Sequence, residues 1–167
     1  MLSFRDKLKN LRAKEEDEQR IKELKIEQEK KKREAEQRRI KSELGKLISQ
    51  AQKEIAPFLQ EVNSTYLGGR GQVSVNTSSG CETLEETLKY SRVSIRLRWD
   101  EYDSFMSWGH KELELSLGFD QTVRIKGSSE EKEIQTNDVD WRQKLEDQIM
   151  VLLESGNVSY HGEKSLL

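Results

Sequence analysis

The side chains that most often carry acid–base or nucleophilic catalysis are scarce in this chain. It has two histidines, His110 and His161, and one cysteine, Cys81, which lies in a different segment from both. General acid–base and covalent mechanisms need such groups within hydrogen-bond reach of one another. A single cysteine also excludes an intrachain disulfide and a zinc site built on cysteines. We therefore expect a protein that is not an enzyme, with no catalytic residue and no cofactor.

Carboxylates gather close to one of the histidines. Asp100, Glu101 and Asp103 precede His110 and are of the type that binds Mg²⁺ or Ca²⁺. Their spacing does not match a calcium-binding loop, and charged residues are ordinary in turns that connect strands. We interpret the group as a solvated turn and predict no metal site.

A Gly-rich segment, residues 68–71, has backbone amides that could contact a phosphate. No Lys-Ser/Thr pair follows it and no strand precedes it, so it is neither a P-loop nor a dinucleotide-binding fingerprint. A flexible connection between a helix and a sheet is the favoured interpretation.

A basic block offers a second kind of binding chemistry, for nucleic acid. It consists of Lys30, Lys31, Lys32, Arg33, Arg38, Arg39 and Lys41. Arg92, Arg96 and Arg98 would also share one face of a strand. Sheets that bind single strands place exposed aromatic residues between the basic groups, whereas this face alternates Arg with Ser. A nucleic-acid-associated protein is therefore the alternative hypothesis, and the acidic excess outside the block weighs against it.

The elements that would position these groups begin with a long charged segment. Residues 1–44 contain no Gly or Pro, and 26 of the 44 are charged, 15 basic and 11 acidic. This composition favours one solvated helix, and Ser3 with Asp6 has the spacing of a capping box at its start. The segment carries +4 and the rest of the chain −6, which accounts for the net charge of −2. A charge of +4 spread over such a length attracts anionic partners weakly at cellular salt.

Apolar residues mark the two ends of this helix but not its middle. Phe4, Leu8 and Leu11 fall within about one sixth of the circumference and are flanked by basic residues. The apolar residues between positions 12 and 39 share no face, so the filled heptads of a coiled coil are missing. Instead, i,i+4 pairs support the helix: Glu16–Arg20, Glu18–Lys22, Glu27–Lys31, Glu29–Arg33 and Glu34–Arg38.

Apolar periodicity returns in steps of three and four residues over residues 40–62, at Ile40, Leu44, Leu47, Ala51, Ile55, Phe58 and Val62. This pattern predicts an amphipathic helix that packs on a sheet or on another helix. Pro57 predicts a kink or break, because it removes a backbone donor and disfavours helical angles at Ala56. One helix over residues 3–56 would be about 80 Å long at a rise of 1.5 Å per residue.

Alternating segments between residues 72 and 136 predict an antiparallel sheet of three to five strands with one solvated face. The expected strands are a short one around Val73 and Val75, then 91–99, 111–117, 121–126 and a weak edge at 133–136. An Arg row and a Glu row should face each other on neighbouring strands. Residues 82–89 fit either one helical turn or a loop.

A C-terminal helix is expected at 138–154, capped by Asn137, stopped by Gly156, and burying Trp141, Leu145, Ile149 and Leu152. One face of the sheet would be covered by this helix and by the base of the N-terminal helix, which gives an α+β fold. The predicted organisation is thus an extended charged helical arm (residues 1–39), an α+β domain (40–156) and a flexible tail (157–167).

From this layout we expect an interaction or scaffold protein whose long helix tethers or spaces the α+β domain. Phe4, Leu8 and Leu11 would contact a protein partner or a second copy of the chain, and nucleic acid is the less favoured partner. No apolar run is long enough for a signal peptide or a membrane span, so a cytoplasmic location is expected.

Overall fold

The computed structural model describes residues 3–102 and 108–162. Asp103, one of the carboxylates considered above, lies outside these residues. The chain divides into two compact units, Met1–Arg39 and Ile40–Leu167. The first unit is the arm, and the second contains the sheet and the remaining helices.

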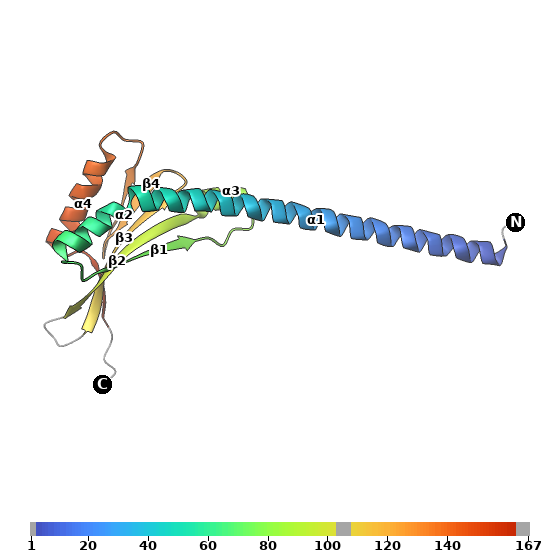
Figure 1. Cartoon of the computed structure of the whole chain (residues 1–167), viewed down its shortest axis with the longest axis horizontal. Helices are drawn as coiled ribbons and strands as arrows, with labels where there is room; N and C mark the ends of the chain where they lie inside the picture. Colours follow the sequence, from blue (N-terminus) through green and yellow to red (C-terminus); the bar gives the residue numbers. More distant parts are fainter. Residues whose placement is uncertain (1–2, 103–107, 163–167) are drawn as a thin grey trace. The chain divides into compact units, whose positions relative to one another are not determined.

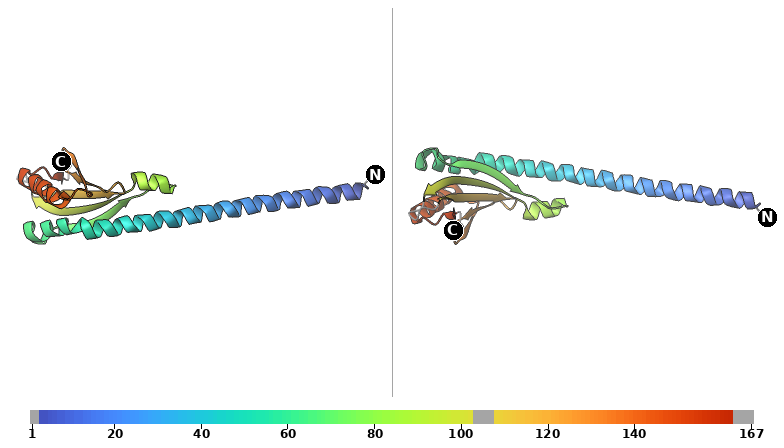
Figure 2. Two further views of the ribbon diagram at one scale, coloured as in Figure 1. Left: turned by 90° about the horizontal axis from the view of Figure 1, so that it is seen from above. Right: turned by 90° about the horizontal axis from the view of Figure 1, so that it is seen from below.

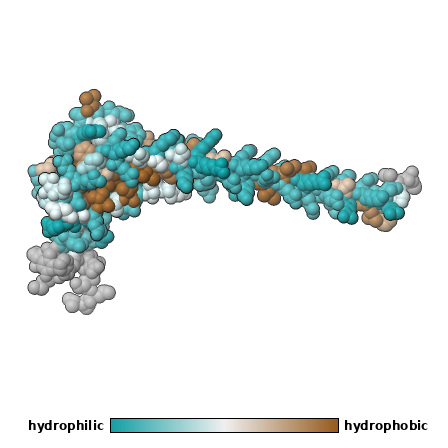
Figure 3. Space-filling view, in the orientation of Figure 1, coloured by the Kyte–Doolittle hydropathy of each residue, from teal (hydrophilic) through white to brown (hydrophobic). Residues whose placement is uncertain are grey.

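The arm is helical from Phe4 onwards, as part of helix α1 (Phe4–Glu54). Ser3 caps it, because its hydroxyl accepts a hydrogen bond from the Arg5 N–H at 3.2 Å. Of the expected charge pairs, Glu27 and Lys31 are in contact at 2.7 Å. Nearly all of its side chains are exposed, and Figure 3 shows a hydrophilic surface with isolated hydrophobic patches.

The second unit is built on an antiparallel sheet in which strands β1 to β5 pair in sequence order (Figure 1). Their bounds are β1 (Gln72–Ser78), β2 (Arg92–Tyr102), β3 (Trp108–Gly118), β4 (Thr122–Lys126) and β5 (Glu131–Gln135). Each expected strand is present, and β2 and β3 are longer than predicted. Their alternation of apolar and polar residues places one full set of apolar side chains on the inner face.

A sixth strand corrects the expected flexible tail over residues 159–162; the rest of that segment, 163–167, lies outside the described residues. β6 (Ser159–Gly162) pairs with the N-terminal half of β3, and Val158 before it is buried. β4 pairs with the C-terminal half of β3, so the two strands share that edge. The segment had no signal of its own because it is short and polar, and its backbone hydrogen bonds depend on the free edge that β3 offers.

The core lies between the inner face of the sheet and the helices. It contains Ile95, Leu97 and Leu115 from the sheet, all with no exposed surface, together with Ala51 from the base of the long helix and Ile55 directly after it. Leu145 and Ile149 contribute from helix α4 (Trp141–Ser155) to the same core. One sheet face is thus covered by both helical segments, as predicted.

The expected amphipathic helix over residues 40–62 is three elements. α1 ends at Glu54, α2 (Ala56–Glu61) carries Pro57 in its first turn, and a π-helical turn η1 (Val62–Tyr66) follows. The break before Pro57 is as predicted, because proline at the start of a helix loses no hydrogen bond. Ile55 and Leu59 on either side of the break are fully buried.

The undecided segment 82–89 forms helix α3 (Leu84–Tyr90). Its cap is Thr83, whose hydroxyl accepts a hydrogen bond from the Glu86 N–H at 3.2 Å. Thr83 and Glu86 have capping-box spacing, so a signal for this helix was present in the sequence. In both views of Figure 2, α3 lies at the opposite end of the sheet from α2 and α4.

Helix α4 begins three residues later than predicted. Its N-terminal cap residue is Asp140, not Asn137, and residues 137–140 form turns before it. The Lys144 ammonium contacts the carboxylates of Asp138 and Asp140, both before the first turn, at 3.1 and 3.0 Å. Gly156 ends the helix with a φ of +67°, as its position predicted.

The outer face of the sheet carries the expected rows of opposite charge. Arg96 lies opposite Glu114 in the register of β2 and β3, and its Nε is 3.2 Å from the Glu114 carboxylate and 3.8 Å from that of Glu112. Arg98 lies opposite Glu112 in the same register. These cross-strand pairs favour the observed register over a shift by one residue.

Candidate functional site

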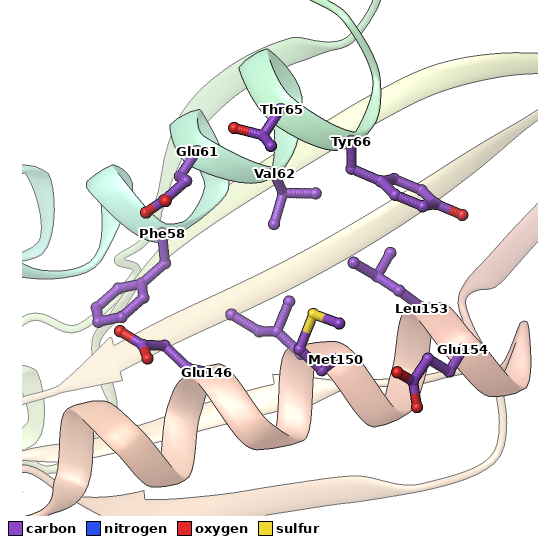
Figure 4. A pocket seen from close by; sticks show the side chains of 10 residues that line it. Phe58, Glu61, Val62, Thr65, Tyr66, Glu146, Met150, Leu153 and Glu154 are labelled. Atoms are coloured by element: carbon purple, nitrogen blue, oxygen red, sulfur yellow. The ribbon is translucent and has the colours of Figure 1, made fainter.

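An apolar groove separates the two helical segments that cover the sheet (Figure 4). One wall is α2 with η1 and the other is α4, and the volume of the open groove is about 570 Å³. The lining residues are Phe58, Glu61, Val62, Thr65, Tyr66, Glu146, Ile149, Met150, Leu153 and Glu154. The volume falls within the range that is usual for ligand-binding clefts.

Helical periodicity places the apolar residues on the groove. Phe58, Val62 and Tyr66 follow one another at four-residue spacing on the first wall. Met150 and Leu153 lie one turn apart on the second wall. Figure 4 shows Val62 and Met150 pointing into the space between the helices. The α4 wall, from Glu146 to Glu154, is about 12 Å long at 1.5 Å per residue.

The groove exposes apolar surface that the core does not use. Tyr66 is 61% exposed and Met150 52% exposed, although both stand beside a well-packed core. Ile149 below them is only 3% exposed and forms the floor. Contiguous exposed apolar surface of this kind marks interaction sites more often than isolated apolar residues do.

The polar residues at the edge of the groove are mostly acidic. Glu61 comes from the first wall, and Glu146 and Glu154 come from the second. Within residues 3–102 and 108–162, no lysine or arginine forms a salt bridge with any of these three carboxylates. The groove therefore combines an apolar floor with a negative edge, which suits a ligand that is apolar on one side and basic around it.

The first wall is held in place by the turn that follows it. Asn63 accepts a hydrogen bond from the Gly71 N–H at 2.7 Å and donates one to the Gly71 carbonyl at 3.1 Å. Gly68 and Gly69 adopt φ values of +60° and +81°, which reverse the chain at little steric cost. The Gly69 N–H donates to the Asn63 carbonyl and the Arg70 N–H to the Leu67 carbonyl.

These contacts correct the interpretation of residues 68–71 as a flexible connection, because the turn is fixed by hydrogen bonds on both sides. They also argue against a phosphate site there. The amides of Gly69, Arg70 and Gly71 already donate to acceptors of the chain, whereas phosphate binding needs such amides free.

At one end of the groove, Phe58 packs against Trp141. Their ring centroids are 6.1 Å apart and the planes meet at 61°, an edge-to-face arrangement. Trp141 is the first residue of α4, so this contact joins the starts of the two walls.

The residues predicted to contact a partner all lie on the arm and are exposed. Phe4 is 77%, Leu8 52% and Leu11 57% exposed. Their spacing of four and three residues puts them on one side of the helix. No comparable stripe follows, although Ile21, Leu24 and Ile26 are also exposed.

The basic block Lys30–Lys41 is also exposed on α1. Four of its residues fall within about 100° around the helix: Lys30, Lys31, Arg38 and Lys41. Glu27 and Glu34 lie on the same side, so the positive face is interrupted. Successive residues of a helix turn by about 100°, so Lys30, Lys31, Lys32 and Arg33 point in four directions. On the sheet, Arg96 is paired with glutamates and Arg92 lies 3.9 Å from Asp120. Neither basic group presents a continuous positive surface for nucleic acid.

His110 and His161 come together where β3 pairs with β6. Their rings stack with centroids 5.0 Å apart, and Arg98 donates a hydrogen bond to the His110 Nδ1 at 2.8 Å. Burial, followed by the neighbouring positive charge of Arg98, lowers the pKa of His110 below its usual value. The shift favours the neutral imidazole over the charged one. Among the described residues, no group of three or more potential ligands is placed to hold a metal ion.

The groove was not predicted from the sequence. The sequence pattern places Phe58 and Val62 on the buried face of the amphipathic helix, and Met150 and Leu153 flank the predicted buried face of the last helix. The sequence does contain one indication of the groove. Met150 and Leu153 form a second apolar row beside the expected buried face of the last helix.

Comparison of the chain with models of known protein families, with curated protein sequences and with solved structures found no match. Among the described residues, no helix combines the length and the apolar character that crossing a membrane requires.

Proposed function

We propose that this chain is a non-enzymatic interaction protein whose α+β unit binds an amphipathic helix in the groove between α2–η1 and α4. The observation that carries the proposal is the open apolar floor with Glu61, Glu146 and Glu154 at its edge. Grooves of this form bind helices through apolar anchors at i, i+4 and i+7. The charged helical arm would act as the tether or spacer that was inferred from its composition.

The acidic edge specifies the chemistry of the ligand. A helix with lysines or arginines beside its apolar stripe would place positive charge against the three carboxylates. Such complementarity favours the encounter and selects against acidic helices. A small anionic ligand, for example a fatty acid, would meet repulsion at the same edge.

Site-specific photo-crosslinking in cells tests this proposal in the intact chain. A crosslinking amino acid replaces Met150 in one version and Val151 in the control version. The two positions are neighbours on α4 with similar exposure, 52% and 49%, but only Met150 lines the groove. We expect crosslinks from position 150 to a peptide with apolar residues at i, i+4 and i+7 and basic neighbours. Equal crosslinking from both positions, or none from position 150, would overturn the proposal.

The alternative, a nucleic-acid-associated protein using the basic block, has less support. Lys31 already contacts Glu27, and both Glu27 and Glu34 interrupt the side of the helix on which most of the block lies. A salt titration of oligonucleotide binding, given in the Discussion, distinguishes the two functions.

A further inference from the structure

The arm and the groove have matching chemistry. We infer that the groove of one molecule receives the arm tip, residues 3–12, of a second copy of the same chain. This inference rests on the proposed function, and it names the helix that the groove binds.

The spacing of the arm tip is that of a helix bound in a groove. Phe4, Leu8 and Leu11 occupy positions i, i+4 and i+7, and each is more than half exposed. They cover about 10 Å of helix at 1.5 Å per residue. The α4 wall between Glu146 and Glu154 is about 12 Å long by the same rise, so three anchors fill the groove.

The charges on the two surfaces are opposite. Residues 3–12 carry four basic groups and one acidic group, a net charge of +3, against three glutamates at the groove. Arg5 and Arg12 lie about 80–100° to one side of the stripe and Lys7 about 60° to the other, because each residue turns the helix by about 100°. Basic groups therefore border both sides of the stripe, as carboxylates border both sides of the groove.

The chemical complementarity to the groove is confined to the arm tip. Glu15 is the next residue on the face of the stripe, and it would bring a carboxylate to the acidic groove. The other exposed apolar residues of the arm, Ile21, Leu24 and Ile26, have acidic neighbours at Glu23 and Glu27. The tip is thus the arm segment that combines apolar anchors with a clear basic excess.

A contact between a tip and a groove is heterologous, since the two molecules contribute different surfaces. Each bound molecule still has one unused tip or groove, so the assembly grows into chains or closes into rings. The average size of the purified protein should then rise with concentration. Because the edge contacts are exposed ion pairs, the affinity should fall about tenfold between roughly 50 mM and 500 mM salt.

Four single substitutions in the full chain test the inference by sedimentation velocity. Leu8→Gln removes the central anchor of the tip, and Met150→Gln removes an apolar contact of the groove. Glutamine adds no charge and is a good helix former. Each should weaken self-association about 10- to 100-fold, the equivalent of burying one large apolar side chain. Leu24→Gln and Val151→Gln change exposed apolar residues of the same two helices and should leave association unchanged.

Mixing the two impaired variants gives the sharpest result. Leu8→Gln chains keep an intact groove and Met150→Gln chains keep an intact tip, so the mixture should form one-to-one dimers and nothing larger. A contact between two tips, or between two grooves, would not be restored by mixing and would overturn the inference. So would unchanged association of the Leu8→Gln variant.

The outcomes also separate this inference from the proposed function. If the purified chain stays monomeric up to its solubility limit, the second copy is not the occupant of the groove. Crosslinks from position 150 to a basic amphipathic helix of another protein would then still support the proposed function. A monomeric chain with no crosslinks from position 150 would refute both.

Discussion

The side chain of Asn63 connects the groove wall η1 to strand β1, and removing it should lower the stability of the fold. Its amide makes two hydrogen bonds to Gly71, at 2.7 and 3.1 Å, across the turn between η1 and β1. A hydrogen bond contributes about 0.5–1.5 kcal/mol to stability, so Asn63→Ala should lower the free energy of unfolding by about 1–3 kcal/mol. With a urea dependence of about 2 kcal/mol per molar, the midpoint should fall by about 1 M.

Urea unfolding followed by circular dichroism and by tryptophan fluorescence measures this change. Ser64→Ala is the matched control, because the exposed Ser64 hydroxyl donates to the Glu61 carbonyl at 3.2 Å within the same turn. Its effect should stay within about 0.5 kcal/mol. Asn63→Asp keeps the acceptor for the Gly71 N–H and loses the donor, so its effect should be intermediate. A shift for Asn63→Ala no larger than that of Ser64→Ala would refute the assignment of the turn as a fixed element.

Three further predictions concern other parts of the chain. The pKa of His110 is lower in the folded state than its usual value of 6.5, so the unfolded chain binds more protons than the folded chain. The free energy of unfolding should therefore fall as the pH drops from about 7.5 through 6.5. This fall should be smaller in the His110→Gln variant. Chemical denaturation at several pH values measures this, and a stability that rises on acidification would contradict it. Gly156→Ala should lower the free energy of unfolding by about 1 kcal/mol, since φ at this position is +67°. Thermal or urea unfolding measures this, and an unchanged midpoint would show that the helix end tolerates a side chain. Random single-stranded oligonucleotide should show no tight binding at low salt, and binding with a steep salt slope that is lost when Lys30–Arg33 are replaced by Gln would favour the nucleic-acid alternative.

Sequence patterns predicted most of the secondary structure because they report on single elements. Val93, Ile95 and Leu97 alternate with polar residues, so one strand face had to be buried. Ile40, Leu47 and Ala51 recur at helical spacing and are buried as expected. The absence of Gly and Pro before Gly45 predicted the uninterrupted helix in the same local way.

Elements that depend on distant partners were missed or misplaced. β6 is held by hydrogen bonds to β3, which lies about fifty residues earlier in the chain. No sequence pattern within residues 157–167 predicts this pairing. The start of α4 was misplaced because Asn137 and Asp140 are both residue types that cap helices, and the local pattern does not choose between them; Asp140 takes the cap position without a side-chain capping hydrogen bond. The fixed turn at residues 68–71 depends on Asn63, whose two hydrogen bonds form only when η1 and β1 meet.

The sequence by itself determined a long charged helix with an apolar, basic tip, and an α+β unit with one buried sheet face. These follow from composition and from the periodicity of each segment. Only the tertiary structure decided that α2–η1 and α4, which are about eighty residues apart in the chain, lie on the same sheet face with a groove between them. The distance between two packed elements is set by the side chains beneath them, here Ile149 and the sheet, and no pattern within one segment encodes it.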